Sequence, residues 1–313
     1  MAIAPDDENA IVDRQDWLNL MGRIGQEDGF FAAAGDRHWT LHAEEGSNLL
    51  VTFDTLGAAL DRKGQMPHLF DLASTMGWSY LCIIAEGATW FRDPAVYEFF
   101  DRMVDESFFD GFDRVQFYGA GMAGYAACAF SVAAPGSTVL AVAPRATLTP
   151  SRTPFETRNR SARRLDFTSR YGFAPDMVRA AKDVWILRDP FHFEDAAQAA
   201  LFQGRHVQTL NIRLMGDRAE KALEDLDILP KLIDAAMKGE MSAELLAGLW
   251  RGRRKLGGYL KQLLLRTDTA GREALSYAIC SNVARRTRAP KFRRRLEDMD
   301  AARAAAKEPV SGD

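Results

Sequence analysis

Residues 113–136 read DRVQFYGAGMAGYAACAFSVAAPG, and this stretch decides the fold. A short run rich in β-forming residues leads into a turn with three closely spaced glycines, and small apolar residues follow. The pattern predicts a strand, a tight turn and a helix. Such a turn either cradles the phosphates of a dinucleotide or presents a nucleophile at the head of the helix.

The sequence around the turn argues against a dinucleotide-binding loop. Gly119, Gly121 and Gly124 match the spacing GxGxxG literally. That loop normally follows the first strand of its fold, and an acidic residue ends the second strand about 20 residues later. Here two predicted strands precede the turn, at 48–56 and 79–87, and the next strand, TVLAVAP, ends in proline without an acidic residue.

Strand and helix patterns alternate on both sides of the turn, which predicts a mostly parallel sheet with helices on both faces. Apolar residues at helical spacing within 8–34 predict one or two N-terminal helices, and no strand pattern remains after about residue 242. We expect an N-terminal helical region at 1–45, an α/β core at 46–240 with a basic insert near 151–176, a basic helical C-terminal region at 241–300 and a flexible tail at 301–313.

The stretch YGAGMAGYAA at 118–127 resembles the nucleophile elbow of α/β-hydrolases. Many of those read Y-G-x-S-M-G-G-Y-A-A, including members encoded among bacterial surface-polysaccharide genes. The resemblance covers roughly residues 48–240 and implies an α/β-hydrolase-like core. It places Gly121 at the serine position, Asp189 at the position of the triad acid and Asp217 at the position of the catalytic histidine.

On this alignment only the acid is retained, so we expect no acyl-enzyme. Gly121 has no side chain to attack a carbonyl, and Asp217 has no imidazole to move a proton. The backbone N–H of Met122 and one from the loop at 53–55 would still form an anion site like an oxyanion hole. The candidate ligand-binding residues are Gly119, Gly121, Met122, Phe53, Asp54 and Trp90, of which Trp90 suits a core or rim position better.

The sequence therefore favours a catalytically degenerate protein that binds a small anionic or glycan-like ligand, or another protein. The alternative is a hydrolase or transferase in which Asp189, Asp217 and His192 act as acid/base groups on a glycan or a phosphate-bearing substrate, with a link to surface polysaccharide. No cysteine or histidine spacing suggests zinc, and we expect neither a metal nor a cofactor. The remaining histidines show no motif, and the cysteines fit buried, inert thiols: His38, His42, His68, His206, Cys82, Cys128 and Cys280.

Charge is distributed unevenly along the chain. Residues 251–295 hold 14 basic and 2 acidic residues, a net charge of +12, whereas the whole chain carries −3. Leucines at helical spacing in the first half of this segment predict a packed amphipathic helix. We expect the segment to pack internally, against a second copy or against a protein partner. A polyanion-binding role is the second alternative, and nucleic acid is not expected because aromatic residues are sparse there.

Composition is ordinary for a globular protein, with 47% hydrophobic and 27% charged residues. The first ten residues, MAIAPDDENA, lack a basic segment followed by an apolar one, and no run of about 18 apolar residues exists. We therefore expect a cytoplasmic protein without a membrane span.

Over nearly its full length the chain also resembles alphaproteobacterial proteins that carry the name phosphoadenosine phosphosulfate reductase. The residues do not support that activity. Such reductases have an S-G-G-x-D-S-type phosphate loop after the first strand and a reactive cysteine near the C-terminus. No such loop occurs here, and Cys280 lies in a helical pattern, LSYAICSNVA, without a Glu-Cys-Gly motif.

Overall fold

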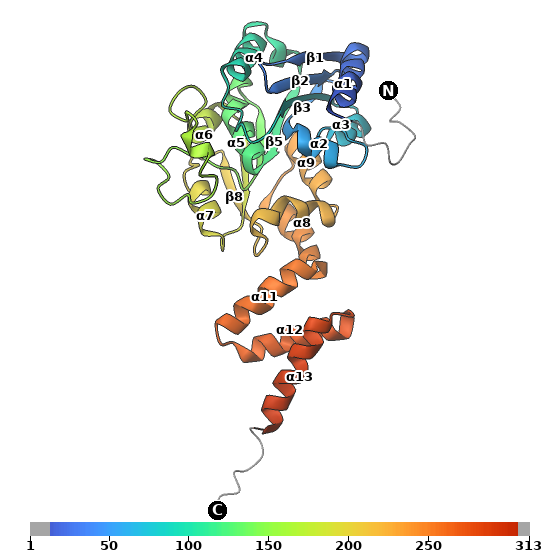
Figure 1. Ribbon diagram of the computed structural model, residues 1–313, viewed down its shortest axis with the longest axis vertical. Coiled ribbons are helices and arrows are strands. Elements are labelled where there is room, and N and C mark those ends of the chain that lie inside the picture. Colours follow the sequence, from blue (N-terminus) through green and yellow to red (C-terminus); the bar gives the residue numbers. More distant parts are fainter. Residues whose placement is uncertain (1–12, 306–313) are drawn as a thin grey trace, which may run out of the picture. The chain divides into compact units, whose positions relative to one another are not determined.

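The computed structural model describes residues 13–305 and contains an eight-stranded sheet (Figure 1). The strand before the predicted turn is β5, in the middle of this sheet. The strands lie in the order β1-β2-β4-β3-β5-β6-β7-β8. The pairings β1–β2 and β2–β4 are antiparallel, and all the others are parallel. The bounds are β1 (Gly29–Ala33), β2 (His38–Ala43), β3 (Asn48–Thr55), β4 (Ser79–Ala85), β5 (Arg114–Ala120), β6 (Thr138–Val142), β7 (Asp183–Arg188) and β8 (Val207–Asn211).

This strand order, with its antiparallel pairings at one edge, is that of an α/β-hydrolase-like fold, and the predicted fold class is confirmed. Helices follow the strands of the parallel part, as the sequence predicts. The bounds are α1 (Arg14–Asp28), α2 (Leu56–Asp61), α3 (Phe70–Met76), α4 (Pro94–Asp105), α5 (Gly121–Phe130), α6 (Ala174–Met177), α7 (Phe193–Ala199), α8 (Ala219–Asp225), α9 (Leu229–Lys238), α10 (Ala243–Leu249), α11 (Gly257–Thr269), α12 (Glu273–Arg286) and α13 (Pro290–Ala305).

Local signals in the sequence explain where several helices begin and end. Asp93 caps α4 by accepting a hydrogen bond from the Ala95 N–H, and Pro94 occupies the first turn, where its missing N–H is not needed. Thr55 caps α2 in the same way, with its hydroxyl accepting from the Ala58 N–H. At the other end of a helix, Gly239 closes α9 in the left-handed conformation that favours glycine.

The two faces of the sheet are covered by different helices. Leu81 and Ile83 of β4 belong to the same buried cluster as Phe100 of α4 and Phe130 of α5, so these two helices share one face. Tyr80, which alternates with Leu81, packs edge-on against Phe70 of α3 on the other face. On that other face α9 contacts β5 and β6. Because the central strands are buried on both sides, they read as continuous apolar runs in the sequence.

The N-terminal prediction needs a correction. One or two helices were predicted within 8–34, and α1 ends at Asp28, but the chain then forms β1 and β2, which were not predicted. These strands extend the main sheet, so the region 1–45 is not only helical. The physical reason is that the runs at 29–33 and 38–43 contain aromatic and β-branched residues that fit a pleated surface. Residues 1–12, on which the expected absence of a leader rests, lie outside the described residues.

The chain divides into two compact units, residues 1–250 and 251–313. The second unit contains α11, α12 and α13 and no strand within its described part, which confirms the predicted helical region. Ser276 of α12 donates a hydrogen bond to Thr267 of α11, and Asp268 forms an ion pair with Arg295 of α13 at 3.2 Å. Most of its arginine and lysine side chains are exposed. The tail predicted at 301–313 is helical up to Ala305, and 306–313 lie outside the described residues.

No helix within residues 13–305 combines the length and the apolar character needed to cross a bilayer.

The turn between β5 and α5 depends on two glycines with different roles. A Cβ at Gly119 would lie 2.3 Å from the backbone carbonyl of Ala123, so strand and helix cross too closely for any other residue. Gly121 has a φ of +56°, and a Cβ there would meet no atom within 4 Å. The first position therefore needs glycine for space, whereas the second favours glycine for its backbone conformation alone.

The two glycines predict different costs for the same substitution. Gly121→Ala should lower the free energy of unfolding by about 1 kcal/mol, the cost of a left-handed alanine. Gly119→Ala should lower it by about 3 kcal/mol or more, because backbone atoms must move apart. Urea unfolding followed by circular dichroism measures both values. Equal losses, or a larger loss at Gly121, would contradict the described crossing of β5 and α5.

Candidate functional site

The turn between β5 and α5, which we call the elbow, is a sharp strand-to-helix turn with Gly121 at its centre. β5 ends at Ala120, and α5 begins directly at Gly121 in the left-handed conformation. No side chain of residues 13–305 caps the N-terminus of α5, so the first N–H groups of the helix have no side-chain acceptor within that range. The uncapped end of a helix carries partial positive charge and attracts anions.

A cavity of about 230 Å³ lies beside this elbow at the carboxyl edge of the sheet. Elements far apart in the sequence meet in its wall: the end of β3, the elbow, the loop after α2 and the start of α8. The predicted binding residues Phe53, Asp54, Gly119 and Met122 all line it. The other lining residues are Thr55, Ala58, Arg62, His68, Phe91, Ala120, Ala123 and Glu220.

Asp54 holds the wall together and has few lone pairs left for a ligand. Its side chain is 5% exposed and forms a two-pronged ion pair with the Arg62 guanidinium. The same carboxylate accepts hydrogen bonds from the backbone N–H groups of Thr55 at 2.7 Å and His68 at 2.8 Å. Asp54 thereby ties the loop that carries Arg62 and His68 to the end of β3, and its negative charge is balanced there.

A second charged group in the wall consists of His68, Glu220 and Tyr118. The Tyr118 hydroxyl donates a hydrogen bond to Glu220 Oε1 at 2.7 Å. His68 Nε2 lies 3.2 Å from the same oxygen, within ion-pair distance. An imidazole and a carboxylate thus lie together at the cavity.

The pKa values in this group shift in opposite directions. Burial and the neighbouring carboxylate raise the pKa of Tyr118 well above its usual value, so the phenol stays protonated and remains a donor. Burial also tends to raise the pKa of Glu220, but the contacts with His68 and Tyr118 outweigh it and lower that pKa. Glu220 is therefore a carboxylate near neutral pH.

Trp90 lies behind the elbow rather than in the cavity. It is 3% exposed, and its ring packs near Tyr125 and Phe167. Its backbone N–H points to the sulfur of Met122 at 3.3 Å. Trp90 therefore supports the elbow from the core and does not present a ligand platform.

Asp189 follows β7, as the alignment predicts, but backbone amides occupy its carboxylate. One oxygen accepts from the N–H groups of Met215 and Gly216 at 2.8 and 2.9 Å, and the other accepts from the N–H of Phe191 at 3.0 Å. The side chain is 3% exposed. Asp189 fixes the loop after β8 to the loop after β7 and does not line the elbow cavity.

His192 and Asp217 belong to a separate ion-pair network around Arg158. The Arg158 guanidinium lies 2.8 Å from Asp195 and 3.4 Å from Asp217, and it also pairs with Glu156 at 2.9 Å. Ligand atoms of His192, Asp195 and Asp217 lie within 4.8 Å of one another, a spacing that a metal ion would accept. Arg158 already supplies the positive charge between them, so the group fits an ion-pair network better than a metal site.

Sequence reasoning did not single out Arg62, His68 or Glu220 as site residues, although all three line the cavity. Arg62 and His68 follow β3, the strand that carries Asp54, and this position in the chain was the available signal, because loops at the carboxyl ends of parallel strands meet at one edge of a sheet. Glu220 comes three residues after Asp217, the position assigned to the base. The start of α8 brings Glu220, rather than Asp217, to the elbow.

Comparisons with known proteins bear on this geometry only weakly. No protein-family model matches the chain, and no curated protein sequence matches it. Solved structures with a similar arrangement include the capsule O-acetyltransferase of Neisseria meningitidis serogroup A (11% identity, 63% of this chain and 91% of that chain, TM-score 0.44). Another is Est1E from Butyrivibrio proteoclasticus (11% identity, 66% of this chain and 98% of that chain, TM-score 0.44). A third is a putative hydrolase from Agrobacterium vitis S4 (14% identity, 66% of this chain and 95% of that chain, TM-score 0.39). The fold is established by the strand order of this chain itself.

The lowered pKa of Glu220 predicts a pH dependence of stability. A carboxyl group with a depressed pKa stabilises the folded state above its unfolded pKa, and that contribution is lost as the pH falls through the folded value. Glu220→Gln removes this contribution. The free energy of unfolding of the wild type should therefore fall more steeply than that of the variant as the pH drops from 6 to below 4.

Urea unfolding at several pH values measures this difference, and Tyr118→Phe serves as a matched variant. It removes one of the two contacts that lower the pKa, so its pH dependence should lie between those of the wild type and Glu220→Gln. Parallel curves for the wild type and Glu220→Gln over the whole range would rule out the described coupling.

Proposed function

We propose that this chain is a catalytically disarmed α/β-hydrolase-like protein that binds a small anion, a carboxylate in particular, in the elbow cavity. One observation carries the proposal. The elbow keeps its left-handed turn and its uncapped helix N-terminus, but its central residue is Gly121, which has no side chain to form a covalent bond.

The charges in the cavity wall favour a carboxylate. The two acidic residues are already balanced, Asp54 by Arg62 and Glu220 by the contacts with His68 and Tyr118. What remains for a ligand is the set of N–H groups at the start of α5, which no side chain of the described residues caps, and Arg62 and His68 lie in the same wall. Donors without a matching acceptor attract an anion.

A second candidate function rests on His68. An imidazole beside a carboxylate is the arrangement of a general base, and His68 Nε2 lies 3.2 Å from Glu220 Oε1 in the cavity wall. In this candidate, water replaces the missing serine as nucleophile, and His68 takes the role assigned to His192 in the sequence. Asp189, Asp217 and His192 themselves do not line the cavity.

Anion binding predicts a specific NMR response of the full chain to sodium acetate at constant ionic strength. The backbone amides of Met122 and Ala123 should shift and saturate with a Kd on the order of millimolar, as expected for so small a ligand. Ala58→Phe, which fills the cavity from α2, should abolish the shifts.

Leu60→Phe is the matched control, since Leu60 lies on the same helix but does not line the cavity. Its response should equal that of the wild type. Absence of saturation in the wild type, or an unchanged response in Ala58→Phe, would show that the elbow does not bind the anion.

A further inference from the structure

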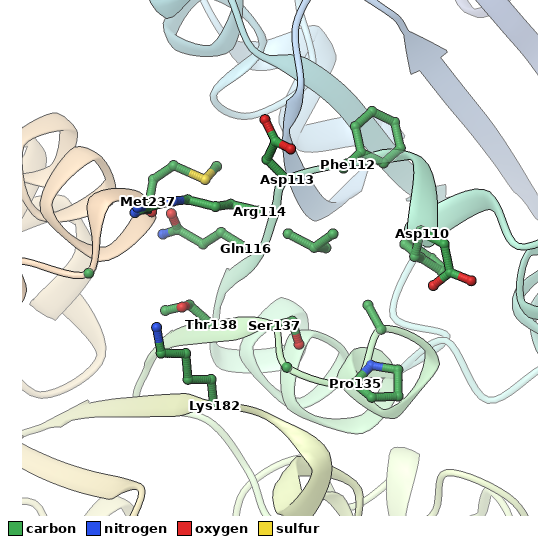
Figure 2. Close-up of a pocket in the computed structure, with 15 residues that line it drawn as sticks. Asp110, Phe112, Asp113, Arg114, Gln116, Pro135, Ser137, Thr138, Lys182 and Met237 are labelled. Carbon is green, nitrogen blue, oxygen red and sulfur yellow. Dashed lines mark hydrogen bonds between the residues drawn. The ribbon is translucent and has the colours of Figure 1, made fainter.

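A larger cavity, of about 440 Å³, lies at the amino ends of the parallel strands, opposite the end that carries the elbow. It is formed where β5 and β6 begin, next to the residue before β7 and the turn that ends α9. Figure 2 shows its wall, with Arg114, Gln116, Thr138 and Lys182 as sticks. This cavity is separate from the elbow, which lies at the other end of β5.

Gln116 is the unusual residue in this wall. Its side chain is fully buried on β5, between Leu50 of β3 and Thr138 of β6 in the strand register. Neither its amide oxygen nor its amide nitrogen has a hydrogen-bond partner among the described residues. A buried amide without partners costs free energy, and an apolar residue would avoid that cost. A polar molecule in the cavity would satisfy both atoms.

Two cations lie beside this amide. Arg114 donates one hydrogen bond to the Met237 carbonyl at 2.8 Å, and neither Arg114 nor Lys182 forms an ion pair with a carboxylate within residues 13–305. Figure 2 shows the amide of Gln116 and the ammonium of Lys182 on the same side of the cavity as Met237. Asp110 and Asp113 lie elsewhere on its rim (Figure 2).

We propose that this cavity binds a small hydroxylated anion, a phosphate or carboxylate with a neighbouring hydroxyl group. The anionic oxygens accept hydrogen bonds from the Gln116 amide nitrogen and are neutralised by Lys182 and Arg114. The Gln116 amide oxygen accepts from the hydroxyl group of the ligand. This assignment explains why a glutamine occupies a buried position at which an apolar side chain would be at least as stable.

The test compares binding with stability in the same variants. Isothermal titration calorimetry of the full chain uses sn-glycerol 3-phosphate and glycerate as probes, which distinguish a phosphate from a carboxylate, and inorganic phosphate, which lacks the carbon-bound hydroxyl. At least one hydroxylated probe should bind the wild type, and more tightly than inorganic phosphate. Gln116→Leu should weaken that binding about tenfold or more while leaving the urea midpoint unchanged or higher, because it removes an unpaired buried amide.

Lys182→Gln should weaken binding several-fold without changing the urea midpoint. Lys231→Gln, an exposed position on α9 that does not line the cavity, is the control and should bind as the wild type does. The proposal is overturned if no hydroxylated probe binds the wild type saturably. It is also overturned if Gln116→Leu binds the probe normally, or if it lowers the urea midpoint, since the amide would then serve the fold.

Discussion

The close crossing of β5 and α5 is the constraint on which the rest of the structure depends. With no Cβ at Gly119, the strand backbone passes against the carbonyl of Ala123. Gly124 likewise lies close to Pro144, which follows β6. These contacts seat the small-residue helix α5 on the sheet, and its aromatic residues then pack with α4 in the main buried cluster. The elbow and its cavity exist because the helix starts this close to the strand.

The sequence predicts the parallel part of the fold well, and the reason is burial. Strands β3, β4, β6 and β7 are short runs of mainly apolar residues, so their pattern is visible without a structure. The hairpin of β1 and β2 was missed because its first strand, GFFAA, is only five residues long and directly follows α1. Its role depends on pairing with β4, which lies far along the chain.

The candidate site likewise contains residues that the sequence predicts and residues that it does not. Gly119, Gly121 and Met122 are neighbours in the sequence, and the turn chemistry that identifies them is local. His68 and Glu220 meet only because Asp54 binds Arg62 and fixes one loop, while α8 brings in the other. Asp189 has the expected position after β7, yet the amides that surround it come from a loop whose path no local pattern specifies.

β5 thus runs between two cavities. At its carboxyl end lies a sharp turn with Gly121 at its centre, and at its amino end lies a buried amide without a hydrogen-bond partner among the described residues. The buried amide conflicts with stability alone, because an unsatisfied amide costs free energy, whereas glycine adopts the left-handed conformation at position 121 without strain. Residues that break the local rules of folding in this way are expected at binding sites.

The most direct test of the disarmed elbow is the reaction of the purified chain with p-nitrophenyl acetate, followed by nitrophenol release and by intact mass. We expect no release above the buffer rate, no burst and no mass increase by an acetyl group, in the wild type and in His68→Asn alike. An acetyl adduct on a residue of the elbow cavity, or turnover that His68→Asn abolishes, would contradict the claim that this fold has lost its catalysis.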